Sequence, residues 1–188
     1  MNIVALAGSV AGSRTRTAVG HTVAYLSEHA AGHTVTTLDL ADYTLAFSDG
    51  RNYLDYTGDT AVVVRRIMEA DVLIVGSPVF QASIPGALKN VFDLLPSGAF
   101  RDKVVAMIVT AGSPRHYLIP EIQLKPILTY LKAHVVEDYV FIEDREIHRG
   151  DIVEDDARLR IERLVDDTLT LASVYAEVRA RKDKEYGF

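Results

Sequence analysis

The sequence predicts an α/β fold in which a five-stranded parallel sheet carries helices on both faces. Strand-length apolar runs alternate with helix-length segments along the chain, which is the pattern of parallel α/β proteins. The runs at 2–7, 71–78 and 103–112 are apolar without alternation, as expected of strands buried on both faces. No repeat, low-complexity segment or linker divides the 188 residues, so we expect one domain over 1–188.

The first half of the chain supplies three of these strands and two helices. Val19, Val23 and Leu26 recur at helical spacing, and Gly32 is a typical residue after a helix end. The segment HTVTTLDL alternates and is β-branched, whereas residues 41–58 hold tyrosines and turn formers with no clear period. In order we expect a strand at 2–7, a helix from residue 17 to about 31, a strand at 33–40, a long connection at 41–58, a helix at 60–70 and a strand at 71–78.

The second half continues the alternation. Pro85 stands near the first turn of an apolar helical segment, where proline is tolerated, whereas Pro126 falls inside another and is expected to interrupt it. Glu154, Asp155 and Asp156 are favoured at the start of the last helix by the helix dipole, so they do not indicate a metal site. In order we expect a helix at 84–95, a strand at 103–112, a helix at 121–133, a strand at 134–142 and a helix at about 154–182.

Composition and charge exclude several classes of protein. The formal net charge of -6 disfavours a nucleic-acid binder, which would need a basic face, and the absence of cysteine excludes disulfides and cysteine ligands. No apolar run reaches the length of a membrane span, so we predict a soluble cytoplasmic protein that has no membrane segment. His29 and His33 have the spacing of helical metal ligands, but Gly32 breaks the helix between them, so no metal site is expected.

Three loops follow predicted strands and are rich in small, hydroxyl and glycine residues. They are GSVAGSRT after strand 2–7, GSPVFQASIPG around the end of strand 71–78, and TAGSPRH after strand 103–112. The carboxyl ends of parallel strands meet at one edge of a sheet, where open α/β sheets bind their ligands. The sequence therefore predicts a binding site at this edge.

The first loop suits an anion, because hydroxyls, glycine backbone and the N-terminus of the next helix would all face it. The loop matches neither G-x-x-x-x-G-K-[ST] nor G-x-G-x-x-G, so a single terminal phosphate is favoured over a triphosphate or a dinucleotide. The alternative is that a hydroxyl of this loop only caps the helix. The residues concerned are Gly8, Ser9, Gly12, Ser13, Arg14, Thr15 and Arg16.

The second loop suits a planar heteroaromatic ring. Pro78 stiffens the backbone, Phe80 offers a flat apolar face, and backbone polar groups remain at residues 79–82. The alternative is that Phe80 belongs to the core.

The segments GSVAGSRT, SPVFQASIPGALKNVFDLLP and TAGSPRHYLIPEIQLKPILTYLKA, in this order and at these separations, resemble the NAD(P)H-dependent FMN reductase family. In particular they resemble the alkanesulfonate-type FMN reductases that supply two-component monooxygenases. The resemblance covers roughly residues 1–142. It implies a flavodoxin-like, doubly wound five-stranded parallel sheet with strand order 2-1-3-4-5.

The resemblance also implies the roles of individual residues. The FMN phosphate would be held by Ser9, Ser13, Arg14 and Thr15. The isoalloxazine ring would be lined by Pro78, Val79, Phe80 and Gln81. The far side of the ring would be closed by Thr110, Gly112 and Ser113.

The implied chemistry is hydride transfer from NADPH or NADH to FMN, for which the protein supplies orientation and no obligatory side-chain acid or base. His116 follows the third loop and could reach the flavin or nicotinamide edge, the alternative being an ordinary polar loop residue. The connection at 43–57 and the resemblance together predict a homodimer or homotetramer. A flavin-dependent monooxygenase is the expected partner if reduced FMN is released.

Two other functions stay open at this point. An enzyme with the same site could pass electrons to a quinone, an azo dye or a metal oxyanion, because acceptor choice depends on the shape of the pocket. A flavodoxin-type electron carrier would hold FMN without a nicotinamide site. Such a carrier would usually show a T-x-T-G-x-T-like phosphate loop, which this sequence lacks.

Overall fold

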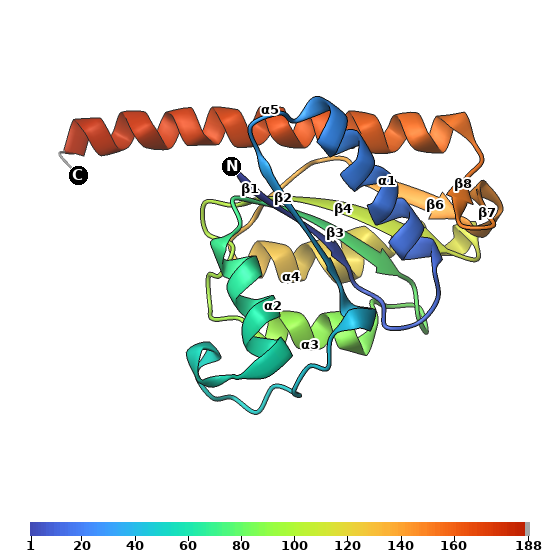
Figure 1. Cartoon of the computed structure of the whole chain (residues 1–188), viewed down its shortest axis with the longest axis horizontal. Coiled ribbons are helices and arrows are strands. Elements are labelled where there is room, and N and C mark those ends of the chain that lie inside the picture. Colours follow the sequence, from blue (N-terminus) through green and yellow to red (C-terminus); the bar gives the residue numbers. More distant parts are fainter. Residues whose placement is uncertain (187–188) are drawn as a thin grey trace.

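A computed structural model describes residues 1–186, and its elements follow the predicted alternation (Figure 1). The strands of the main sheet are β1 (Asn2–Ala7), β2 (Thr34–Asp39), β3 (Val72–Pro78), β4 (Val104–Ala111), β5 (His134–Val135) and β6 (Val140–Glu143). The α-helices are α1 (Arg14–His29), α2 (Gly58–Glu69), α3 (Gly86–Leu94), α4 (Lys125–Tyr130) and α5 (Asp155–Tyr186). The shorter elements are the turns η1 (Leu40–Asp42), η2 (Tyr53–Asp55), η3 (Pro114–His116), η4 (Pro120–Leu124) and η5 (Asp144–Glu146), and the hairpin of β7 (Ile147–His148) and β8 (Asp151–Ile152).

The main sheet is parallel throughout, and its strand order confirms the predicted 2-1-3-4-5. The fifth strand is broken, which the sequence did not predict: β5 and β6 both pair with β4, and residues 136–139 separate them. Glu137 and Asp138 are exposed in this interruption. Four residues of the edge strand (136–139) stand opposite two of β4 (106–107), so the strand bulges there and pairs again at Val140, and the bulge leaves both carboxylates in solvent.

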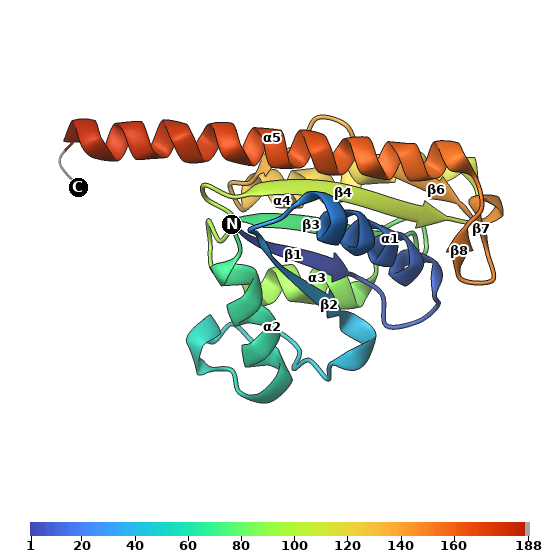
Figure 2. The same cartoon turned by 45° about the horizontal axis from the view of Figure 1, so that its top comes forward.

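Helices cover both faces of the sheet (Figures 1 and 2). On one face, α2, α3 and α4 pack over a core that includes Leu73, Val75 and Met107. On the other face, α1 and α5 pack over Ile74 and Ile108. Neighbouring residues of β3 therefore face opposite cores, which is why its sequence is apolar without alternation.

Helix boundaries differ from the sequence prediction in ways that affect the site. Helix α1 begins at Arg14, so three residues expected in the first loop form the first turn of the helix. The predicted helix 121–133 is divided into the π-helical turn η4 and the short helix α4, in which Pro126 is the second residue. The two are contiguous, since the Lys125 N–H still donates to the Pro120 carbonyl, and the wider π-helical turn is a local irregularity of the helix just before the proline. The predicted interruption is thus real but lies before Pro126.

The last helix is longer than predicted, and its C-terminal part extends past the end of the sheet (Figures 1 and 2). Within residues 1–186, no helix combines the length and the apolar character that a membrane crossing requires.

Candidate functional site

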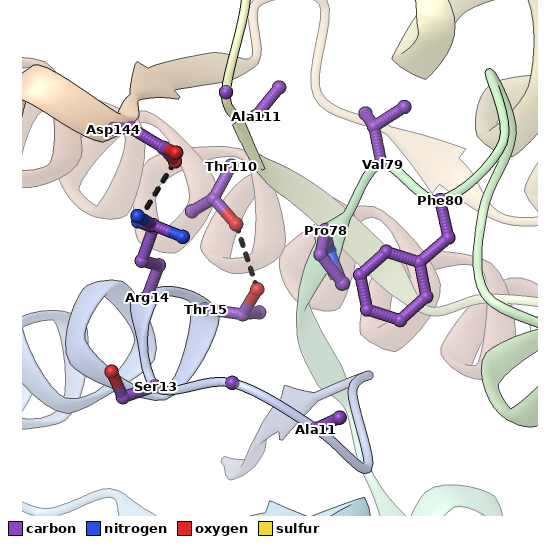
Figure 3. Close-up of a pocket in the computed structure, with 12 residues that line it drawn as sticks. Ala11, Ser13, Arg14, Thr15, Pro78, Val79, Phe80, Thr110, Ala111 and Asp144 are labelled. Atoms are coloured by element: carbon purple, nitrogen blue, oxygen red, sulfur yellow. Dashed lines mark hydrogen bonds and ion pairs between the residues drawn. The ribbon is translucent and has the colours of Figure 1, made fainter.

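The three predicted loops meet at the carboxyl edge of the sheet and enclose a pocket of about 120 Å³ (Figure 3). A fourth segment, the end of β6, joins them. The residues that line the pocket are Ala11, Gly12, Ser13, Arg14, Thr15, Pro78, Val79, Phe80, Thr110, Ala111, Gly112 and Asp144.

The first loop presents the N-terminus of α1 to this pocket. Gly12 has a φ of 83°, a left-handed conformation that glycine adopts without strain, and the chain then turns directly into the helix. Ser13 is the N-cap residue, and its hydroxyl makes no capping hydrogen bond with the described part of the chain. The first N–H groups of a helix have no helical acceptor. The sequence RTRT places no acidic side chain in this turn, so these donors stay available to an anion.

Ser9 is buried and turned into its own loop. Its hydroxyl donates to the Ala11 carbonyl at 2.5 Å and lies 3.3 Å from the Ala11 nitrogen. This side chain shapes the loop and does not line the pocket.

Two contacts fix the start of α1 close to the sheet. Gly76 of β3 lies under the helix, where an added Cβ would come within 2.5 Å of a Val19 methyl and 3.0 Å of the Thr15 methyl. The Thr15 and Thr110 hydroxyls are buried and hydrogen-bonded to each other at 2.8 Å, which joins α1 to β4 (Figure 3). The position of the loop therefore depends on a small residue in β3 and on a polar pair at the base of the pocket.

The two arginines of the first loop have different partners. Arg16 pairs with Asp39 at the end of β2 and with Asp42, and the hydrogen bond that Arg16 donates to the Asp39 carboxylate raises the pKa of the guanidinium. Arg14 lines the pocket, and its Nε lies 2.9 Å from an Asp144 carboxylate oxygen (Figure 3). Arg14 is therefore the arginine that can meet a ligand in this pocket.

The second loop is a strained two-residue turn. Phe80 and Ser83 exchange backbone hydrogen bonds of 2.9 and 3.0 Å, and the residues between them, Gln81 and Ala82, have φ values of 50° and 58°. Two consecutive left-handed residues are typical of a type I′ turn, which glycine and asparagine normally occupy. Phe80 is 44% exposed beside the pocket, so it is not a core residue.

The third loop follows β4 with Gly112 and then enters η3. Ser113 caps this turn by accepting from the Arg115 N–H, and His116 lies half-buried at its end. Neither residue lines the pocket.

Of the site residues named from the sequence, eight line the pocket together: Ser13, Arg14, Thr15, Pro78, Val79, Phe80, Thr110 and Gly112. Four lie outside the lining: Ser9, Gln81, Ser113 and His116. Sequence reasoning missed Asp144. It lies two residues beyond the end of the predicted strand 134–142 and directly after β6, so the strand-end rule applied to the other loops would have found it.

Residues 1–146 match the NADPH-dependent FMN reductase family. The chain belongs to this family. All twelve pocket residues fall within the match, Asp144 included, whereas the whole of α5 falls beyond it. The predicted family and enzyme class, an NAD(P)H:FMN oxidoreductase, are confirmed.

Relatives of this FMN reductase match along most of both chains. An NAD(P)H-dependent FAD/FMN reductase from Geobacillus thermodenitrificans is 34% identical over 87% of this chain and 89% of its own length. The NADH-dependent FMN reductase SfnF of Pseudomonas putida is 30% identical over 88% and 90%. Among solved structures, the apo form of the NADH:FMN oxidoreductase EMOB superposes with a TM-score of 0.76 at 26% identity and covers 90% of this chain and 89% of that one. The flavodoxin-like fold is thereby confirmed.

Proposed function

We propose that the pocket is the flavin site of this reductase and holds FMN by its phosphate. The observation that carries the proposal is the N-terminus of α1 at the pocket. The Ser13 hydroxyl there makes no capping hydrogen bond, and the Arg14 guanidinium lies beside it. Backbone N–H groups, a hydroxyl and a guanidinium form a donor set that suits a phosphate.

The size of the pocket supports loose binding. Sites that bury a whole drug-sized ligand have volumes of about 300–1,000 Å³. A pocket of about 120 Å³ suits the phosphate end, so the ring would lie across the open mouth against Pro78 and Phe80. A flavin held in this way can leave after reduction. We therefore propose that FMN is a released substrate and that reduced FMN passes to a flavin-dependent monooxygenase.

The chemistry requires little of the side chains. FMN, when bound, accepts a hydride from NADPH or NADH, and the protein contributes orientation. Phe80 covers one side of the pocket mouth, and Gly112 leaves the end of β4 without a side chain. His116 lies outside the lining, so we assign it no proton transfer.

The test is oxidation of NADPH and of NADH by the purified protein, with and without added FMN. Oxidation that rises with added FMN to a plateau, with reduced FMN recovered in the filtrate under anaerobic conditions, is the expected result. Full activity without added FMN, with flavin retained on the protein, would contradict release.

A different acceptor is a second candidate. An NADPH azoreductase from Bacillus is 27% identical over 60% of this chain and 63% of its own length. A turnover rate with an azo dye or a quinone that equals or exceeds the rate with free FMN would favour reduction of that acceptor over the release of reduced FMN.

We also propose a homodimer or homotetramer, acting in the cytoplasm. Four large apolar side chains on and around η3, η4 and α4 are more than half exposed: Tyr117, Leu118, Ile122 and Tyr130. Phe47 and Leu54 in the connection 43–57 are also largely exposed. Large apolar side chains left exposed in such numbers are a feature of subunit contacts, which supports the proposal. Light scattering that gives the 20.7 kDa monomer mass at micromolar concentration would contradict the proposal.

A further inference from the structure

Asp144 is an acidic residue in a pocket otherwise suited to an anion. Its Oδ1 lies 2.9 Å from the Arg14 Nε, and its other oxygen, Oδ2, would lie 3.2 Å from a Cβ placed on Gly112. The carboxylate therefore reaches from the end of β6 over the end of β4 to the start of α1. It contacts the one arginine that lines the pocket, since Arg16 is paired with Asp39 outside it.

We propose that Asp144 limits the affinity for FMN by competing with the flavin phosphate for Arg14. This inference rests on the proposed function, because it requires the phosphate to lie at the start of α1. A carboxylate and a phosphate bind a guanidinium in the same way, through charge-assisted N–H···O bonds. Both anions in one pocket also repel each other. Asp144 therefore acts as a specificity-determining and positioning residue rather than as a catalytic one.

The exposure of the pair fits this role. The Arg14 and Asp144 side chains are 54% and 36% exposed, and ion pairs in such positions are weak. A phosphate can thus replace the carboxylate at Arg14. When the flavin leaves, the Asp144 carboxylate pairs with the Arg14 guanidinium again. This exchange of partners favours release of the flavin in each turnover.

The test compares FMN with riboflavin, which has the same ring and no phosphate. Asp144→Asn keeps the shape and an oxygen that can accept from Arg14, but removes the negative charge. The expected result is FMN binding about two- to fivefold tighter, with a slower dissociation rate, and unchanged riboflavin binding. Asp183→Asn, an exposed position near the far end of α5, makes the same change in net charge and should alter neither affinity.

A second variant separates competition for Arg14 from a general effect of charge. In an Arg14→Ala background, most of the gain from Asp144→Asn should disappear, because no guanidinium remains to be released. A full gain in that background would overturn the competition. Equal changes for FMN and riboflavin, or none for either, would also overturn it while leaving the flavin site in place. If neither the parent protein nor Asp144→Asn binds FMN, the proposed function fails as well.

Discussion

The first and second loops border the same pocket, but their backbones are built in opposite ways. In the first loop the left-handed residue is Gly12, and the chain then enters a helix whose N-terminal donors face the pocket. In the second loop the left-handed residues are Gln81 and Ala82, which carry side chains. The first loop thus reaches its shape without strain, whereas the second is held in a conformation that costs about 1–2 kcal/mol per residue.

The difference separates two kinds of recognition. The first loop offers polar groups of the helix start, which suit the charged end of a ligand. The second loop offers an aromatic face, and its strained turn fixes where Phe80 stands relative to the pocket. Strained backbone of this kind persists at binding sites because the surrounding structure holds it in place. If the two loops divide recognition in this way, changes to the first should act through the phosphate and changes to the second through the ring.

The largest effect is expected from Gly76→Ala, which disturbs the support of the first loop. The new methyl would meet Val19 and Thr15 and push α1 away from the sheet. We expect a loss of about 1–3 kcal/mol in the free energy of unfolding, together with loss of FMN binding. Urea unfolding measures the free energy of unfolding, and flavin titration measures FMN binding.

The matched control is Gly20→Ala in α1, where the methyl meets open space and should stabilise the helix by about 0.5–1 kcal/mol. The same sign for both variants would refute the close-approach argument.

Arg14→Ala is expected to have the next largest effect, and only on the phosphate end. Losing a charge-assisted hydrogen bond of about 1.5 kcal/mol should weaken FMN binding about tenfold and leave riboflavin binding unchanged. Arg16→Ala is the control, because Arg16 is turned toward Asp39. Calorimetry with both flavins distinguishes the variants. An equal loss for FMN and riboflavin would place the phosphate elsewhere.

Phe80→Ala, in contrast, should not discriminate between the two flavins. Removing an aromatic contact of about 0.5–1.5 kcal/mol should weaken FMN and riboflavin alike, by about two- to tenfold. Phe47→Ala, which removes an equally large and more exposed ring outside the pocket, should change neither affinity. If Phe80→Ala weakened FMN alone, the second loop would not be the ring platform.

The smallest effect is expected from Ala82→Gly, which relieves strain without removing a pocket contact. Glycine adopts the left-handed conformation freely, so the free energy of unfolding should rise by about 0.5–1 kcal/mol after its greater chain entropy is counted. Ala24→Gly in the exposed part of α1 should lower it by a similar amount. Thermal unfolding of both variants gives the sign. A less stable Ala82→Gly protein would show that the turn is not strained.

The sequence alone determined the layers of the fold and the edge that carries the site. Continuous apolar runs required strands buried on both faces, and only a parallel sheet with helices on each side supplies such burial. The same reasoning placed the small and hydroxyl residues at one edge, because all parallel strands end there. The individual residues came from the family resemblance and from the position of His116 after the third loop, and eight of those twelve line the pocket.

What only the tertiary structure decided are the pairings between distant segments. That Arg14 rather than Arg16 faces the pocket depends on Asp39 and Asp144, which stand far from the first loop in the chain. The left-handed turn after Phe80 also depends on the surrounding structure, since neither of its two left-handed residues is a glycine or an asparagine. The local pattern of apolar residues predicts whether a segment is buried. Packing of the segments decides which charged side chains form ion pairs, because only the folded chain brings these residues within a few ångströms of each other.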